Sequence, residues 1–222
     1  VKGSIAHTQM LATIGLLTKS ELKQIHTELK NILKEIQQGN FKIDKGVEDI
    51  HSQIEIELTR RLGEAGKKIH SGRSRNDQVL VDLKLFLRNE IHTLTDSIRP
   101  LFEQLLLLSE QHREKLLPGY THFQLAMPSS FGLWFGAYAE GLSDDLLSLQ
   151  AAYRLVNRNP LGSAAGYGSS FPIDRELTTR LLGFDDLHVN VVYAQMSRGK
   201  TERIVAQAIG NVAATLSRFA MD

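Results

Sequence analysis

Two short polar segments carry the residue types that could do chemistry in this chain of 222 residues. The first, residues 71–79, places a serine, an arginine, an asparagine and an aspartate side by side in the sequence. The second, residues 119–128, contains a neighbouring threonine and histidine. Hydroxyl, amide and guanidinium groups donate to small anions, and a histidine can transfer a proton. We therefore expect the function to lie in these two segments and to involve a small anionic substrate.

The first segment comes directly before a long apolar-periodic run, so Ser74 to Asp77 should lie at the start of a helix. Free backbone amides and the helix dipole favour an anion there, and Arg75 could bind a carboxylate or phosphate through two hydrogen bonds. A purely structural interpretation is that Ser74 or Asn76 caps the helix, with Asp77 favoured in its first turn. The spacing alone favours this helix cap.

The second segment follows a Pro-Gly pair, which predicts that Thr121 and His122 lie on an extended turn. A histidine beside hydrogen-bonding Thr and Gln side chains can act as a general base, or orient one, because its pKa lies near neutrality. A lone loop histidine is more often a surface or structural residue. The 8 histidines of the chain make an accidental placement easy.

Three other features could suggest a site. Histidines scattered among carboxylates are His51, His70, His112 and His122. They lack a recognised spacing such as His-Glu-x-x-His, so we predict no metal site. Residues 162–168 are glycine-rich but lack the Gly-Lys-Ser/Thr ending of a phosphate loop and follow no strand pattern, so we predict a flexible turn. The mixed charges of residues 200–203 predict a solvated helix face.

Composition narrows the class of partner. The 26 basic and 25 acidic residues leave a net charge of +1, which gives no global field favouring nucleic acid or a membrane surface. The absence of cysteine excludes disulfides and fits a reducing interior. No apolar run reaches the roughly 18 residues of a membrane span, and no signal-peptide pattern is present. We expect a soluble, cytoplasmic protein that binds a small molecule. We also expect a truncated chain, because it starts at Val1 and stops within a helical period at Asp222.

Long amphipathic helices must position the two segments. Helices are predicted at about residues 3–17, 18–38, 47–62, 76–116, 129–156 and 173–182, and from about residue 191 onwards. From Leu87 to Leu108 the apolar residues alternate spacings of four and three, which predicts a coiled-coil-like seam. At 1.5 Å per residue this helix would be on the order of 60 Å long. Pro100 should bend it rather than end it.

The apolar faces exceed what one compact chain can cover. The consecutive leucines from Leu105 to Leu108 span more than one helix face, so they need more than one neighbouring helix. We predict an all-α fold, an elongated bundle of long helices completed by oligomerisation. Residues 1–72 would form an N-terminal helical domain whose start is missing. Residues 73–222 would form a central long-helix bundle whose C-terminal part is absent.

Whole motifs then indicate a family. The blocks are Gly3–His7, Glu48–His51 with Ile54-Glu55, Gly72–Val79, Tyr120–Pro128, and Pro160–Ser163 with Phe171–Arg175. In this order they resemble the argininosuccinate lyases of the fumarase/aspartase superfamily. The resemblance implies the long-helix bundle of that superfamily. It also implies reversible β-elimination of argininosuccinate to L-arginine and fumarate, in arginine biosynthesis and without a cofactor.

The resemblance also implies roles for individual residues. Ser74, Arg75 and Asn76 match substrate-binding positions, and Thr121 matches a carboxylate ligand. His122 matches the histidine of the acid/base machinery. His51 matches a supporting position. The family assembles each active site from three subunits of a homotetramer.

The sequence departs from the family pattern at three places. The family's upstream serine and aspartate are missing, as is its Gly-Ser-Ser-x-Met-Pro-x-Lys loop, so we expect an incomplete active site in this chain. The Ser-x-Arg-Asp pattern is broken around Ser197, which leaves the roles of Arg198 and Arg203 open. Alternative functions are another fumarate-releasing lyase of the superfamily (adenylosuccinate lyase, aspartase or fumarase), an inactive homologue such as a lens δ-crystallin, and a helical oligomerisation module.

Overall fold

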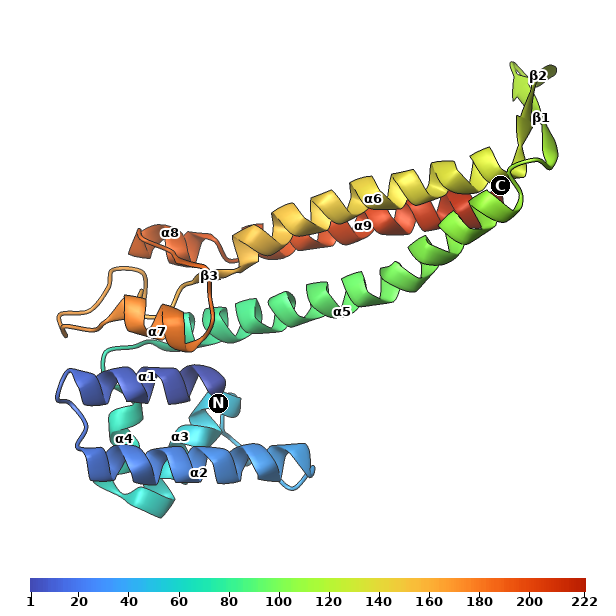
Figure 1. Cartoon of the computed structure of the whole chain (residues 1–222). Helices are drawn as coiled ribbons and strands as arrows, with labels where there is room; N and C mark the ends of the chain where they lie inside the picture. Colours follow the sequence, from blue (N-terminus) through green and yellow to red (C-terminus); the bar gives the residue numbers. More distant parts are fainter. The chain divides into compact units, whose positions relative to one another are not determined.

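The computed structural model describes all 222 residues, and most of them lie in helices (Figure 1). The helices are α1 (Lys2–Thr13), α2 (Lys19–Gln37), α3 (Ile50–Leu62), α4 (Glu64–Lys67), the 3-10 helix η1 (Lys68–His70), α5 (Arg75–Gln111), α6 (Phe131–Val156), α7 (Arg175–Leu181), α8 (Val191–Met196) and α9 (Lys200–Met221). The strands are β1 (Leu116–Thr121), β2 (Gln124–Ser130), β3 (Arg158–Asn159) and β4 (Asp186–Leu187). The predicted all-α class, with long helices, is confirmed. None of the helices combines the length and hydropathy that a transmembrane span requires.

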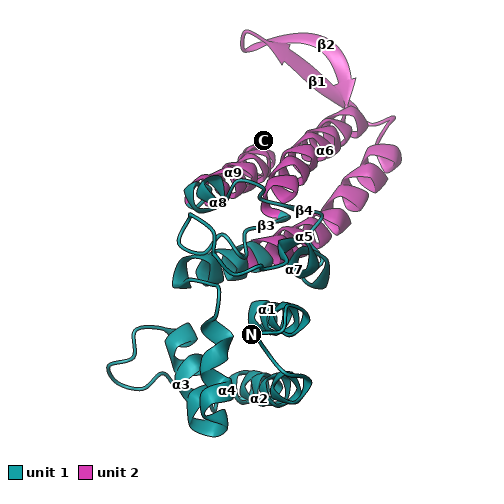
Figure 2. Cartoon of the chain, turned by 90° about the vertical axis from the view of Figure 1, so that its left-hand side faces the viewer, with its two compact units in different colours: residues 1–85, 157–198 teal, residues 86–156, 199–222 magenta.

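The chain divides into two compact units (Figure 2). The first unit contains residues 1–85 and 157–198, and the second contains residues 86–156 and 199–222. Each unit is therefore built from two separate stretches of sequence. The domain boundary expected between residues 72 and 73 stays a prediction.

The first unit has two apolar clusters. In the larger one, α1, α2 and α3 contribute buried residues such as Met10, Leu29 and Leu58. The smaller one joins distant parts of the sequence, with Val81 of α5 packed together with Leu161 and other residues of the second stretch. This second cluster packs the first turns of α5 with the segment that follows β3.

The start of α2 shows how local sequence sets an element of this unit. Thr18 and Glu21 form the reciprocal capping box that their spacing predicts. The amide of Glu21 donates to Thr18 Oγ1 over 3.2 Å, and the amide of Thr18 donates to Glu21 Oε2 over 2.8 Å. Lys68 donates to the same carboxylate, and together these bonds lower the pKa of Glu21 to about 2.

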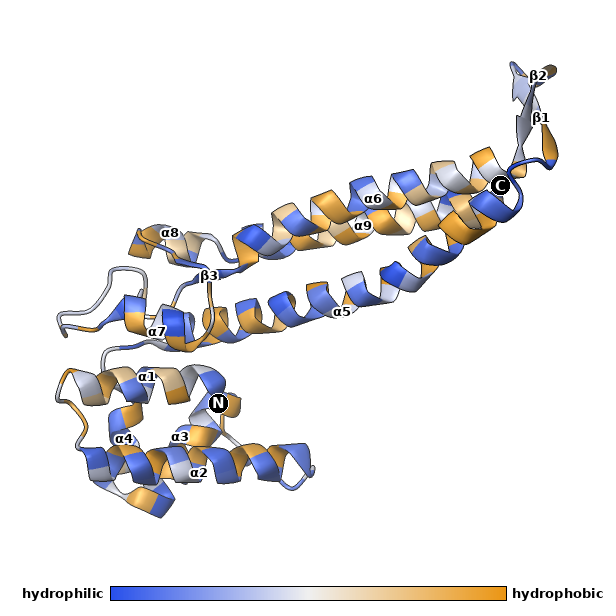
Figure 3. Ribbon diagram, viewed as in Figure 1, coloured by the Kyte–Doolittle hydropathy of each residue, from blue (hydrophilic) through white to orange (hydrophobic).

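The second unit packs α6 against α9 and against the rest of α5. Hydrophobic residues recur along all three helices (Figure 3). Ile91, Ile98 and Leu105, spaced by seven residues, are buried as the seam predicts. Pro100 lies inside α5, and the helix continues past it. Leu106 and Leu107, however, are 48% and 50% exposed, so part of the leucine run is only half covered within the chain.

The segment between α5 and α6 differs from the expectation. The helix predicted to reach about Leu116 ends at Gln111, and an antiparallel hairpin of β1 and β2 follows. Its register runs from Leu116 opposite Ser130 to Thr121 opposite Gln124, with an irregularity after Pro118. Proline cannot donate a backbone hydrogen bond in a helix interior, whereas an edge strand tolerates it. The predicted extended turn is thus the tip of a hairpin.

The helix predicted from about residue 191 onwards is divided into two helices in the structure. α8 ends at Met196 and α9 begins at Lys200, and Gly199 between them has φ of +76°. A glycine adopts this left-handed conformation at little cost, so it breaks the helix where the apolar period alone gave no signal.

Candidate active site

The predicted cap at the start of α5 is confirmed. The amide of Asn76 donates to Ser74 Oγ over 3.3 Å, and the amide of Ser74 donates to Asp77 Oδ1 over 3.0 Å. Serine and aspartate thus cap the helix reciprocally, as in a capping box. In this cap the Ser74 hydroxyl accepts one hydrogen bond. Its own proton remains able to donate a hydrogen bond to another group.

The side-chain amide of Asn76 is a second polar group available at this turn. Its side chain is exposed and makes no hydrogen bond within the chain. An amide group offers two donors and one acceptor oxygen. The start of α5 therefore displays an unengaged amide beside the positive end of the helix dipole.

Arg75 is bound by protein groups of the α3 region. Its guanidinium donates to Gln78 Oε1 over 2.8 Å and to Ser52 Oγ over 3.0 Å. It also pairs with Asp49 at 3.3 Å and with Glu55 at 3.4 Å. Sequence reasoning missed Asp49, Ser52 and Glu55 as partners because they lie 20 to 26 positions upstream. The guanidinium is therefore a cation held in one place rather than a free side chain.

Asp77 connects this turn to the glycine-rich segment. Its carboxylate is fully buried, and Oδ2 accepts from the amides of Gly162 and Ala164, each over 3.0 Å. Burial raises the pKa of Asp77, while these amides and the nearby Arg73 oppose the rise. The flexible turn predicted at residues 162–168 is instead held at its start by a carboxylate. Sequence reasoning placed Asp77 in the first turn of the helix and missed this contact.

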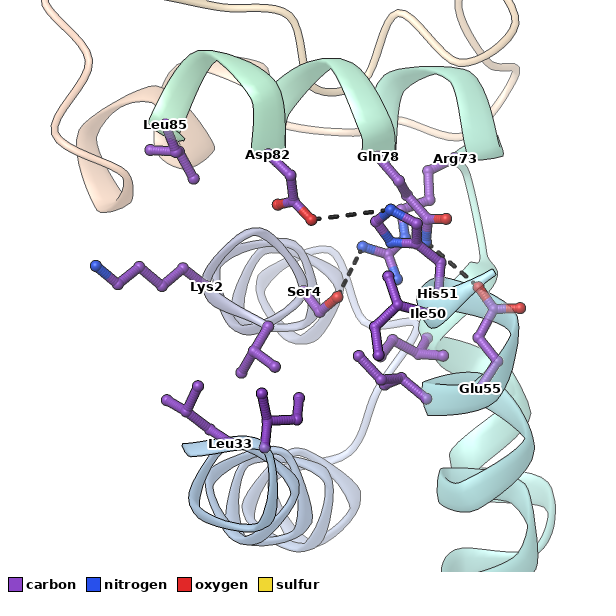
Figure 4. Close-up of a pocket in the computed structure, with 14 residues that line it drawn as sticks. Lys2, Ser4, Leu33, Ile50, His51, Glu55, Arg73, Gln78, Asp82 and Leu85 are labelled. Carbon is purple, nitrogen blue, oxygen red and sulfur yellow. Dashed lines mark hydrogen bonds and ion pairs between the residues drawn. The ribbon is translucent and has the colours of Figure 1, made fainter. Parts of the chain in front are cut away.

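A cavity of about 280 Å³ lies between α1, α2, α3 and the first turns of α5 (Figure 4). Arg73 reaches into it and donates to Ser4 Oγ over 3.3 Å, while its Nε has no partner. In the same cavity, His51 Nε2 lies 3.9 Å from a carboxylate oxygen of Asp82. Burial lowers the pKa of Arg73 to about 10, and burial also lowers the pKa of His51. His51, expected to support the site, lines this cavity from α3, the helix whose N-cap residue Asp49 pairs with Arg75.

Thr121 and His122 lie at the exposed tip of the β1–β2 hairpin. His122 and Phe123 have φ of +50° and +63°, as the two central residues of a type I′ turn require. Asparagine and glycine usually fill such positions, and bulky residues there are uncommon. Strained backbone of this kind clusters at functional sites. The turn displays the imidazole to solvent.

The predicted site residues therefore fall into two groups. Ser74, Arg75 and Asn76 belong to the first unit, whereas Thr121 and His122 belong to the second. Within the first unit the structure joins Arg75 to the acidic start of α3 and Ser74 to Asp77. No group of three or more His, Cys, Asp or Glu residues is arranged to hold a metal ion.

Solved structures that share this arrangement of helices include an EDDS lyase and a fumarate lyase/δ-crystallin. The crystal structure of an EDDS lyase in complex with formate matches with a TM-score of 0.89 and 28% identity over 99% of this chain and 43% of that one. A fumarate lyase/δ-crystallin structure from Brucella melitensis matches with a TM-score of 0.83 at 17% identity, and so supports the fold alone. It covers 100% of this chain and 53% of that one. The sequence model of a family described as "Lyase" matches residues 1–222, and the chain belongs to this lyase family.

Among curated proteins, the chain is similar to argininosuccinate lyases. Those of Bacteroides thetaiotaomicron and Parabacteroides distasonis are 63% and 64% identical over 222 residues, which is 100% of this chain and 50% of each relative. The one from Xylella fastidiosa is 44% identical over the same length, again 50% of the relative. The resemblance drawn from the motifs is confirmed. The chain spans about half the length of the curated relatives it matches.

Proposed function

We propose that the whole protein catalyses the reversible β-elimination of argininosuccinate to L-arginine and fumarate, in arginine biosynthesis. The observation that carries this proposal is the 63% identity, over all 222 residues, to a protein named argininosuccinate lyase. The motif that distinguishes this substrate within the superfamily, residues 72–79, is complete in the chain.

The chemistry of the reaction matches the residue types at both segments. A base must remove a weakly acidic proton from the carbon next to a carboxylate, and the electron pair left behind must be stabilised before the C–N bond breaks. The departing nitrogen then takes up a proton. In our proposal Ser74 and Asn76 bind a substrate carboxylate at the start of α5, and Thr121 binds one from the hairpin.

His122 is the proposed acid/base residue. Its exposed, strained position would let the imidazole reach a substrate bound elsewhere. Arg75 would contribute positive charge from a fixed position, since its guanidinium is already oriented by Asp49 and Ser52. Fixed charges stabilise developing negative charge without reorganising during the reaction.

A homotetramer with shared active sites completes the proposal. The exposed leucines of α5 and the apolar residues of the hairpin would be covered by other copies of the chain. Each shared active site would then combine residues from several subunits. We propose the cytoplasm as the location, which the absence of cysteine fits.

The test is to incubate the whole protein separately with argininosuccinate, adenylosuccinate, aspartate and malate while following fumarate absorbance. Fumarate release from argininosuccinate alone supports the proposal. Release from a different substrate would identify a sister enzyme of the superfamily. Release from none, by a folded tetramer, would identify an inactive homologue.

A further inference from the structure

The side chain of Asp77 is a buried carboxylate that accepts hydrogen bonds from two places far apart in the sequence. Oδ1 accepts from the amide of Ser74, and Oδ2 accepts from the amides of Gly162 and Ala164, with all three distances 3.0 Å. The side chain is 0% exposed. A buried charge is costly unless it is fully paired, so this carboxylate depends on these amides.

The loop side of this contact is an anion-binding concavity. Gly162 and Ala164 have φ of +85° and +50°, and their amides converge on one oxygen, as in the backbone nests that bind anions. A Cβ atom at Gly162 would lie 2.8 Å from Cγ of Arg175, so no larger residue fits. Gln195 holds the loop from its other side, donating to Ser163 Oγ over 2.8 Å. The nest is thus preformed, and the chain's own carboxylate fills it.

The helix side of the contact is the turn with the proposed substrate-binding groups. Asp77 Oδ1 fixes the amide of Ser74, and Ser74 Oγ in turn accepts from the amide of Asn76. These bonds set the backbone from which the Ser74 hydroxyl and the Asn76 amide project. The orientation of both groups therefore depends on a carboxylate that is itself oriented by residues 162–164.

We propose that Asp77 is a positioning residue, which ties the nest of residues 162–164 to the first turn of α5 and so aligns Ser74 and Asn76 for the substrate. This inference rests on the proposed function. Asp77 touches no substrate, since it is buried beneath the turn. Its effect on the reaction passes through the two residues above it.

The variant that tests this role is Asp77→Asn in the whole protein. An asparagine has the same shape but only one acceptor oxygen, so its NH₂ group must face either the amide of Ser74 or those of the nest. The matched control is Asp174→Asn in the same unit, where the carboxylate accepts from a single amide, that of Leu177, and caps α7. Asparagine caps helices as well as aspartate does.

We expect Asp77→Asn to raise the KM for argininosuccinate about 10-fold or more, the factor for losing one hydrogen bond to a charged group. The control should keep the KM of the unaltered enzyme. KM is the decisive quantity because it does not depend on how much of the sample is folded. A role confined to stability would lower the melting temperature and leave KM unchanged, and that result would overturn the inference.

A second variant and a second measurement keep the test decisive. If Asp77→Asn does not fold, Gln195→Ala loosens the nest from the opposite side, and an unchanged KM there overturns the inference. Hydrogen exchange of backbone amides is the second measurement, and its result does not depend on enzyme activity. Peptides covering residues 73–79 and 160–168 should exchange faster in Asp77→Asn, or in Gln195→Ala, than in the control. Equal exchange overturns the inference, whereas an unaltered enzyme that releases no fumarate overturns only the proposed function.

Discussion

At the scale of single residues, the two proposed contact groups differ in how the chain holds them. Asn76 projects from a turn that Asp77 and Ser74 order by accepting four hydrogen bonds from backbone amides, whereas His122 projects from a strained hairpin tip. The first is fixed by bonding and the second by backbone conformation. Substitutions at these positions should accordingly affect catalysis more than folding.

His122→Asn in the whole protein should lower the rate of elimination about 100-fold or more, the usual scale for losing an acid/base group. The proposed tetramer should persist, because the His122 side chain makes no hydrogen bond within the chain and asparagine accepts positive φ. Fumarate absorbance and sedimentation measure the two properties. Turnover near that of the unaltered enzyme would reject the acid/base role.

Asn76→Ala should weaken substrate binding and leave the melting temperature almost unchanged. The cap of α5 is formed by Ser74 and Asp77, so the free energy of unfolding should fall by less than the roughly 1 kcal/mol that a helix cap contributes. KM and thermal unfolding check both halves of the prediction. A clear loss of stability would show that the amide has a structural role instead.

His7 makes the stability of the first unit sensitive to acid. Burial lowers its pKa from 6.5 to about 3, and its Nε2 lies 2.8 Å from the carbonyl oxygen of Ser71. Above pH 6.5 it is neutral in both states and has no effect. As the pH falls from there towards 3, only the unfolded chain takes up the proton, so the free energy of unfolding decreases.

The loss should be about 2 kcal/mol between pH 6.5 and pH 5, since each pH unit contributes about 1.4 kcal/mol. His7→Gln, which cannot titrate, should lose that much less over the same range in urea unfolding. His188, whose pKa burial lowers to about 4, stays in place in the variant and serves as an internal reference. Equal pH slopes for both proteins would contradict the assignment to His7.

At the scale of elements, close backbone approaches set where helices can meet. A Cβ atom at Gly132, the second residue of α6, would lie 2.5 Å from Ser109 O in α5 and 2.5 Å from Arg113 Cα in the turn after α5. Backbone atoms cannot move aside as a flexible side chain can. The junction of α5 with α6 therefore requires glycine at this position.

Gly132→Ala should destabilise the second unit by about 1–3 kcal/mol, the usual cost of overpacking. Gly210→Ala is the matched control, because nothing lies within 4 Å of a Cβ atom placed there in α9. Its expected effect has the opposite sign, a gain of about 1 kcal/mol from helix propensity. Denaturant unfolding measures both. A neutral Gly132→Ala would mean that the helices can separate freely at this junction.

The elements were predictable to different degrees. Periodicity predicted most of the helices because this signal is local. The hairpin was missed, since its strands contain Pro118 and Pro128 and pair only with each other. The engagement of Arg75 by Asp49 was also missed, because a tertiary contact leaves no mark on the residues next to it in sequence.

At the scale of the whole molecule, large apolar side chains remain uncovered. Leu106 and Leu107 on α5 are about half exposed, and Phe123 at the hairpin tip is 103% exposed. Contiguous exposed apolar surface in a soluble protein usually marks an interface. The proposed tetramer would account for these side chains.

Leu107→Lys should therefore weaken self-association of the whole protein, shifting the sedimenting species from tetramer towards smaller forms. Burying a leucine contributes about 1.5–3 kcal/mol, and an unpaired lysine cannot replace it. Glu110→Lys on the same helix is the control, since it disturbs only a surface ion pair with Arg113. An intact tetramer with Leu107→Lys would place this part of α5 outside the interface.

The bonds between Asp77 and the nest bear on the order in which the protein is made. Their partners are 85 and 87 positions apart, and most of that interval belongs to the other unit. A ribosome adding about 5–20 residues per second delivers the carboxylate many seconds before residue 164 exists. Until then the Asp77 carboxylate cannot accept hydrogen bonds from the amides of Gly162 and Ala164. The first unit can therefore complete its fold only after residues 86–156 of the second unit have been synthesised.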